Sequence, residues 1–254
     1  MPASNATKRF SDRVDNYVRY RPGYPIEILS LLRDRCGFTP AARIADIGFG
    51  TGLFTRMLLE NGNAVWGVEP NQEMREAGEK LLAAFQQFRS VAAPAEKTTL
   101  ESQSVEFVAA AQAAHWFDRE PARREFVRIL RPGGWVVLLW NERLTEGTPF
   151  LVEYEQLLFE YGTDYSEVRH ERTSDSIGEF FAPTPFELET FRTQQIFDYP
   201  ALEGRAFSSS YLPALDDPKA DPLRRSLRSL FERHQAGGQV AFDYDTKVFF
   251  GHME

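Results

Sequence analysis

Short apolar segments alternate with amphipathic helical patterns over residues 43–141, and this alternation constrains the fold more than any other feature. Between the short segments, apolar residues recur every three or four positions, with charged residues on the opposite face. Neighbouring parallel strands need crossover helices, which cover both faces of a sheet. The pattern therefore predicts a doubly wound α/β fold with strands at 43–47, 64–68, 88–91, 105–111 and 135–141.

The alternation stops after residue 143. Helical patterns follow at 149–161, 202–211 and 222–234, and residues 162–185 are polar and irregular. Strand patterns lie at 189–199 and 239–251, the second interrupted by Asp243 and Asp245. The sequence thus predicts a mostly parallel, seven-stranded sheet with a largely helical insertion before its last strand.

The charge balance argues against nucleic acid and membrane partners. The chain has 29 Lys and Arg against 37 Asp and Glu, a net charge of −8, so its average field repels phosphate groups. Neither the first residues nor any later segment supplies the apolar stretch of a signal peptide or membrane span. The single cysteine, Cys36, has no partner for an intrachain disulfide, which favours a reducing, cytoplasmic location.

A glycine-rich loop follows the first predicted strand. It reads Asp46-Ile47-Gly48-Phe49-Gly50-Thr51-Gly52, at the edge where open α/β sheets bind ligands. Glycines let the chain turn sharply into a helix while the backbone approaches a ligand. The second strand ends in Glu69, about 20 residues after Gly48, the offset at which a carboxylate accepts both hydroxyls of a ribose. Together they predict a nucleoside-binding site, in which Asp46 orders the loop or meets a ligand ammonium.

The spacing of the glycines in the loop discriminates between two classes of nucleoside ligand. The nicotinamide dinucleotide fingerprint is Gly-x-Gly-x-x-Gly, and Leu53 stands where its third glycine belongs. A nicotinamide-dependent oxidoreductase is therefore the weaker alternative.

At these residues the chain resembles the class I S-adenosylmethionine-dependent methyltransferases, over about residues 10–142. The resemblance is to the small-molecule group, type 11, that includes the trans-aconitate and ubiquinone-pathway types. Besides the loop, the matching segments are Val68-Glu69-Pro70-Asn71, Ala93-Pro94-Ala95-Glu96, His115-Trp116-Phe117-Asp118 and Glu125 through Gly134.

The resemblance implies a Rossmann-like fold, S-adenosylmethionine as cofactor and S-adenosylhomocysteine as product. It implies that the residues holding the cofactor are Asp46, Gly48, Gly50, Gly52, Glu69, Pro70, Ala95, Glu96 and Gln112, with Tyr20 and Arg21 from an N-terminal segment folded over it. One departure concerns the adenine: Pro94 stands where family members often place an aspartate, so recognition of the adenine amino group falls to Glu96 or to the main chain.

Candidates for the acceptor side follow the fourth and fifth predicted strands. His115 is the candidate general base, because its ordinary pKa suits proton transfer near neutrality; the alternative is a structural histidine. Trp116 is a candidate wall of the acceptor pocket, and Arg143 is a candidate contact for an anionic acceptor or else a solvated loop charge. A carboxylate or thiolate acceptor needs no base at all.

These expectations divide the chain into four parts. Residues 1–42 cover the cofactor, 43–148 form the cofactor-binding core, 149–235 form a mostly helical substrate cap, and 236–254 return as the last strand. The predicted reaction is direct in-line methyl transfer to a small organic molecule.

Other methyltransferase types fit less well. No Asn/Asp-Pro-Pro-aromatic string marks a nucleic-acid enzyme, and Asp118 alone near the fourth strand predicts no metal. A cofactor-binding protein without transfer activity stays open, as do the acceptor and the oligomeric state.

Overall fold

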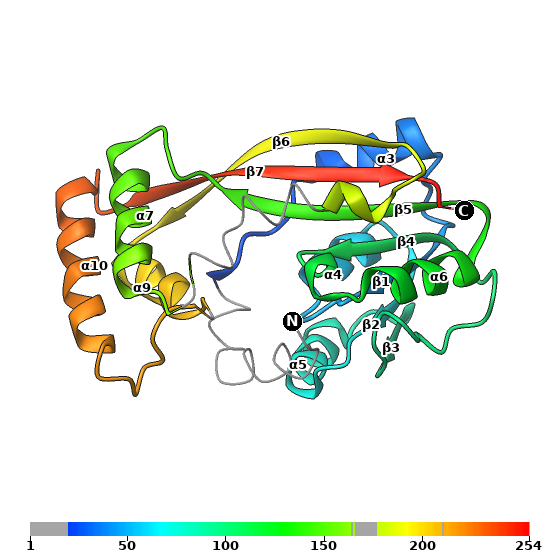
Figure 1. Cartoon of the computed structure of the whole chain (residues 1–254), viewed down its shortest axis with the longest axis horizontal. Helices are drawn as coiled ribbons and strands as arrows, with labels where there is room; N and C mark the ends of the chain where they lie inside the picture. The colour runs from blue at the N-terminus through cyan, green and yellow to red at the C-terminus, as the bar shows by residue number, and fades with distance from the viewer. Residues whose placement is uncertain (1–19, 164, 166–176, 210, 254) are drawn as a thin grey trace.

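The computed structural model describes residues 20–163, 165, 177–209 and 211–253, whose strands form one sheet in the order β3-β2-β1-β4-β5-β7-β6 (Figure 1). The first five strands are parallel to one another, whereas β7 runs antiparallel to both β5 and β6. The strands are β1 (Arg43–Ile47), β2 (Ala64–Val68), β3 (Phe88–Val91), β4 (Val105–Ala111), β5 (Leu130–Arg143), β6 (Phe186–Phe197) and β7 (Val240–Gly251). The predicted doubly wound, mostly parallel sheet is confirmed.

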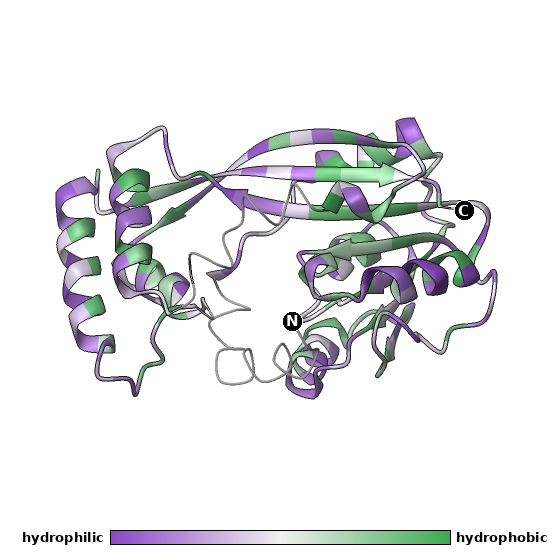
Figure 2. Cartoon of the chain, in the orientation of Figure 1, coloured by the Kyte–Doolittle hydropathy of each residue, from purple (hydrophilic) through white to green (hydrophobic). Residues whose placement is uncertain are grey.

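Helices pack on both faces of the parallel part of the sheet. The crossover helices are α4 (Leu53–Glu60), α5 (Gln72–Leu82) and α6 (Arg119–Ile129), and α3 (Glu27–Cys36) precedes β1. One apolar cluster joins α3 and α4 to the sheet, and a second joins α6 to the opposite face. Figure 2 shows the result: apolar colour along the inner strands and polar colour on the outward helix faces. Burial on both faces explains why these strands read as short apolar runs.

A separate helical block lies at the far end of the long strands β5, β6 and β7 (Figure 1). It consists of α7 (Pro149–Tyr161), α9 (Tyr199–Phe207) and α10 (Ala220–His234), with a third apolar cluster that includes Phe197, Phe242 and Tyr244 from the strand ends. Local signals explain two of its boundaries. The Thr148 hydroxyl caps α7 by accepting from Leu151 N, and the Asp198 carboxylate caps α9 by accepting from Ala201 N.

Three strands differ from the predicted ones. β6 covers Phe186–Phe197 in place of 189–199, and the differences in β5 and β7 have identifiable reasons. β5 starts at Leu130, because Leu130 pairs with Val105 and a register shift absorbs Arg131 to Gly134 before Trp135 pairs with Phe107. β7 is continuous through Asp243 and Asp245, because its two-residue period places both acids on one less buried face. There Gln194 Nε2 donates to Asp243, and Arg192 pairs with Asp245.

Candidate functional site

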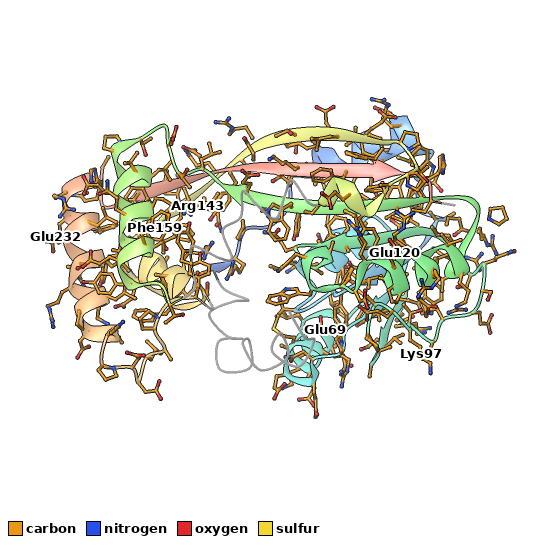
Figure 3. All side chains as sticks on the ribbon, in the orientation of Figure 1. Glu69, Lys97, Glu120, Arg143, Phe159 and Glu232 are labelled. Atoms are coloured by element: carbon orange, nitrogen blue, oxygen red, sulfur yellow. The ribbon has the colours of Figure 1, made fainter. Side chains whose placement is uncertain are left out.

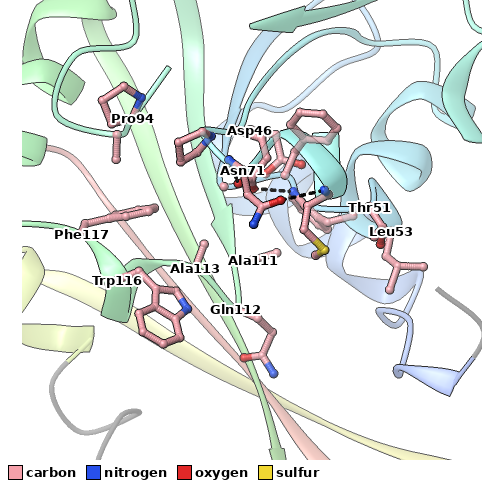
Figure 4. Close-up of a pocket in the computed structure, with 18 of the residues that line it drawn as sticks. Asp46, Thr51, Leu53, Asn71, Pro94, Ala111, Gln112, Ala113, Trp116 and Phe117 are labelled. Carbon is pink, nitrogen blue, oxygen red and sulfur yellow. Dashed lines mark hydrogen bonds between the residues drawn. The ribbon is translucent and has the colours of Figure 1, made fainter. Parts of the chain in front are cut away.

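The glycine loop leaves β1 at the carboxyl edge of the parallel strands (Figure 4). Gly48, Gly50 and Gly52 have φ angles of 71°, 57° and 87°, which glycine adopts without strain. Gly48 N donates to Val68 O at 2.7 Å, tying the loop to the end of β2. A Cβ at Gly48 would lie 2.5 Å from Ala113 Cβ. The loop therefore needs glycine both for its backbone conformation and for its approach to the segment after β4.

Glu69 closes the loop from the end of β2. Its Oε2 accepts from Gly50 N at 3.0 Å, and its Oε1 accepts from Asn71 N at 2.8 Å. Each oxygen has a second lone pair, so the carboxylate can accept two further donors, such as a pair of neighbouring hydroxyls. Glu69 is 9% exposed, and this burial raises its pKa.

Asp46 lies beneath the same loop and is 1% exposed. Its Oδ2 accepts from the Thr55 hydroxyl of α4 at 2.5 Å, while its buried Oδ1 has no hydrogen-bond partner among the described residues. Burial raises the pKa of Asp46 to about 7, with the charge of Glu69 adding to the shift. Two buried carboxyl groups at one loop favour a ligand that brings positive charge and hydrogen-bond donors.

The loop opens into a pocket whose other walls are mostly apolar (Figure 4). Asn71 begins α5 as its N-cap, because its Oδ1 accepts from Met74 N at 2.9 Å, and so places Met74 at the pocket. Ala95 is buried, and Glu96 Oε1 accepts from Asp118 N at 2.7 Å. The pocket is lined by Tyr24, Asp46, Gly48, Phe49, Gly50, Thr51, Leu53, Phe54, Glu69, Pro70, Asn71, Met74, Pro94, Ala95, Glu96, Ala111, Gln112, Ala113, Trp116 and Phe117.

Gln112 lines the pocket directly after β4 in a left-handed conformation, with φ 57°. Its main-chain N donates to Leu139 O at 2.9 Å, and its Nε2 donates to Asn141 O at 3.0 Å. The buried Oε1 has no hydrogen-bond partner within the described part of the chain. A non-glycine residue held at positive φ costs conformational energy, and such residues cluster at functional sites.

His115 and Trp116 follow in a short 3₁₀ turn, η2 (Ala114–Trp116). Trp116 lines the pocket, whereas His115 is not among its lining residues. The His115 ring packs at 4.5 Å from the Trp116 ring and at 4.9 Å from the Trp140 ring, centroid to centroid. The His115 side chain is exposed, and the protein atoms packed around its ring lower the pKa of the imidazole below its ordinary 6.5. Its role as the general base stays a prediction.

Three of the residues proposed from sequence lie toward the helical block instead of lining the pocket. Arg21 Nη2 donates to Ser208 O at the end of α9, and the Tyr20 ring packs against Gly204. Arg143 is 4% exposed, pairs with Glu155 and lies over the Tyr154 ring (Figure 3). Arg143 is thus a buried, partnered charge, and a contact of any of the three with a ligand stays a prediction.

Several pocket residues were not singled out from sequence. Tyr24 lines the pocket and belongs to the aromatic N-terminal segment. The sequence signal that could have pointed to it is Pro25, which follows it and ends this segment before α3. Met74, Phe49 and Phe54 carry no chemical signature, because apolar walls resemble core residues in a sequence.

Comparison with known proteins shows a similarity to methyltransferases. Residues 45–138 match the family described as "Methyltransferase domain". Among curated proteins, an uncharacterized methyltransferase of Mycobacterium tuberculosis is 41% identical over 136 residues, which cover 53% of this chain and 52% of that protein. An uncharacterized methyltransferase-like protein of Schizosaccharomyces pombe is 32% identical over 158 residues, 62% of this chain and 60% of that protein. The chain thus matches about half the length of these relatives.

Solved structures show the same fold. A candidate type II methyltransferase from Anaeromyxobacter dehalogenans has a TM-score of 0.68 at 22% identity, covering 92% of this chain and 98% of that one. A methyltransferase from Geobacter sulfurreducens, solved with S-adenosylhomocysteine, has a TM-score of 0.52 at 15% identity and covers 100% and 99% of the two chains. Residues 45–138 thus match a methyltransferase domain, and the fold is the one seen in these methyltransferase structures, in agreement with the resemblance found in the sequence.

The residues of the pocket fit this cofactor on three observations. Asp46 Oδ1 is a buried acceptor without a partner among the residues that the structure describes, the Glu69 carboxylate has acceptor capacity for two hydroxyls, and the glycine loop leaves room that a Cβ would fill. A metal site is a different matter: in the described ranges no three His, Cys, Asp or Glu residues are grouped to hold an ion. Likewise, none of the helices in those ranges has the length and apolarity to cross a membrane.

Proposed function

We propose that this protein transfers a methyl group from S-adenosylmethionine to a small organic molecule. The observation that carries the proposal is the pairing of Glu69 with Gly50 N across the loop that leaves β1. This pairing puts a carboxylate with free acceptor capacity beside a glycine backbone at the carboxyl edge of the sheet.

The charge of the site favours an adenosyl sulfonium compound over a nicotinamide dinucleotide. Asp46 lies next to the glycine loop, where a dinucleotide would place its anionic pyrophosphate. A second buried carboxyl group there repels phosphate and attracts a cation. The relatives and structures named above are methyltransferases, so nothing among them favours the oxidoreductase alternative.

Each part of the pocket has a proposed role. Asp46 meets the ammonium of the cofactor, Glu69 accepts the ribose hydroxyls, and Gly48, Gly50, Gly52 and Pro70 shape the backbone around them. Ala95 and Glu96 border the adenine, which Pro94 cannot bind through a main-chain donor. Gln112 lies where β4 meets the pocket, at the boundary between cofactor and acceptor.

The bound cofactor supplies an activated methyl group on a sulfonium. The protein then has to align the acceptor with that methyl group and exclude water, which is the larger part of catalysis for such a displacement. Trp116 and Phe117 provide an apolar wall for this purpose, and the unpartnered Gln112 Oε1 can orient an acceptor that carries a hydrogen-bond donor. Since His115 is not among the residues that line the pocket, we propose that transfer proceeds without it.

The experiment is methyl transfer from labelled S-adenosylmethionine across a panel of small-molecule acceptors. We expect labelled product and S-adenosylhomocysteine in equal amounts with at least one acceptor class, and a rate lower by about tenfold or more with the Glu69→Ala variant at low cofactor concentration. Binding of S-adenosylhomocysteine without transfer to any acceptor in the panel or in a metabolite extract would instead identify a cofactor-binding protein without transferase activity.

A further inference from the structure

The helical block contains a buried arginine without an acidic partner among the described residues. Arg205, in the last turn of α9, is 3% exposed. Its Nη1 donates to the Ser209 hydroxyl at 3.1 Å, while its Nε has no hydrogen-bond partner in the part of the chain that the structure describes. Among the described residues, no carboxylate forms an ion pair with it. Arginine is seldom buried unless its charge is paired, because an uncompensated charge is costly inside a protein.

The groups around Arg205 do not neutralise it. Tyr154, Tyr211 and Tyr244 interact electrostatically with it, and burial keeps at least Tyr154 protonated by raising its pKa. The one buried carboxylate nearby, Glu155, is already engaged by Arg143 and by the Tyr165 hydroxyl. Within the described part of this region, two buried arginines therefore share a single buried acid, which leaves the charge of Arg205 without an acidic partner there.

A second buried polar group points to a ligand with acceptor atoms. Tyr244 is 1% exposed, and among the described residues its hydroxyl has no polar partner besides the Arg205 side chain. Tyr244 lies opposite Arg143 in the β5–β7 pairing, and it interacts with Arg205. An anionic oxygen between them could accept from the hydroxyl and from the guanidinium at once, the geometry that favours arginine for carboxylates and phosphates.

The position of this cluster links it to the methyltransferase pocket. Arg143 lies four residues along β5 from Leu139, which pairs with the pocket residue Ala111, so the separation along the strand is about 13 Å. The N-terminal segment spans the same interval. Tyr20 packs on Gly204 of α9, and Tyr24 lines the pocket.

We propose, on the basis of the proposed methyltransferase function, that Arg205 and Tyr244 bind an anionic group of the methyl acceptor. The acceptor is then an elongated molecule with its carboxylate or phosphate on the order of 10–15 Å from the methylated atom. Arg143 and Glu155 hold the cluster in place without contacting the anion.

The first test uses small anions as probes. The thermal midpoint of the full chain is measured with sodium acetate, sodium phosphate or neutral acetamide, at constant ionic strength set by chloride. We expect acetate or phosphate to raise the midpoint of the wild type and of the exposed control Arg233→Met, which loses a surface pair with Glu153 and a hydrogen bond to the Ser229 hydroxyl. Arg205→Met should not respond, and acetamide should have no effect on any protein. A response to one anion alone identifies which group the acceptor carries.

The second test measures methyl transfer to straight-chain carboxylic acids of increasing length, which carry a hydroxyl, amine or second carboxyl group at the far end. The neutral amide of each acid is the control. We expect methylation of acids in a narrow range of lengths, and at least a tenfold loss of kcat/KM in Arg205→Met, mostly through KM. S-adenosylhomocysteine should bind the variant with wild-type affinity. If the wild type does not bind S-adenosylhomocysteine, that result overturns the proposed function and not the anion site.

Two results would overturn the anion site itself. One is an equal response of wild type and Arg205→Met to the small anions. The other is a folded Arg205→Met enzyme that methylates acids as well as the wild type does. Should Arg205→Met fail to fold, Tyr244→Phe removes only the hydroxyl, and a wild-type anion response in that variant counts against the proposal.

Discussion

Burial of Asp46 should make the stability of the free protein fall as pH rises toward neutrality. The carboxyl titrates near 3.8 in its ordinary state and near 7 in the folded protein. Between these pH values the folded state holds a proton that the unfolded chain has released. The unfolded state therefore binds fewer protons, and the free energy of unfolding decreases with increasing pH across this range.

The magnitude follows from the two pKa values. At 1.36 kcal/mol per pKa unit, the penalty of ionising Asp46 in the fold reaches about 4 kcal/mol above pH 7, and about 3 kcal/mol of it develops between pH 5 and pH 8. Asp46→Asn removes the titration and keeps an oxygen that can accept from the Thr55 hydroxyl. We expect Asp46→Asn to gain stability over the wild type by this amount as pH rises from 5 to 8.

The assay is urea denaturation of both proteins without cofactor at pH 5, 6, 7 and 8. Comparing the two proteins at each pH cancels the titration of groups that do not interact with Asp46, such as the histidines, and leaves that of Asp46 together with its coupling to Glu69. A difference in unfolding free energy that stays constant from pH 5 to pH 8 would refute the reasoning, since Asp46 would then titrate outside this range.

Three further predictions concern the same site. Gly48→Ala should destabilise the fold by about 1–3 kcal/mol and weaken S-adenosylhomocysteine binding, because the added Cβ meets Ala113. The control Gly133→Ala has a similar φ of 76° with open space around it and should leave binding unchanged. Equal binding defects in the two variants would contradict the packing argument. His115→Gln should keep the shape of the pH–rate profile between pH 6 and pH 8, because the pKa of His115 is already lowered; loss of an ionisation from that profile would restore it as the base. Gln112→Ala should lower kcat/KM more than cofactor affinity, measured by steady-state kinetics beside calorimetry, and the opposite split would place Gln112 on the cofactor.

The sequence contained enough to predict the parallel core because its strands and helices carry different hydrophobic periods. Those periods placed β1 and β2 with their boundaries, and the turn glycines marked where a backbone must turn at positive φ. The continuity of β7 was harder to predict, because Asp243 and Asp245 interrupt the apolar residues in the sequence, although in the strand both acids lie on one face.

Side-chain placement in the helical block was not predictable to the same degree. Arg143 follows β5, and its position in sequence suggested an exposed loop or the ligand edge. It is buried because β5, β6 and β7 extend past the core and carry the helices with them, and this long-range packing leaves no local signal. Arg205 had no signal either, since an arginine in a helix usually marks a solvated face.

Calorimetric titration of the full chain with S-adenosylhomocysteine tests the central claim most directly. We predict one site per chain, and an affinity at least about tenfold weaker for Glu69→Ala, on the scale of about 1.5–3 kcal/mol for hydrogen bonds to a charged group. The matched change Glu60→Ala removes an exposed acid of α4 and should bind like the wild type. No binding by the wild type, or equal binding by Glu69→Ala, would contradict the assignment of the β1 loop and Glu69 as the cofactor site.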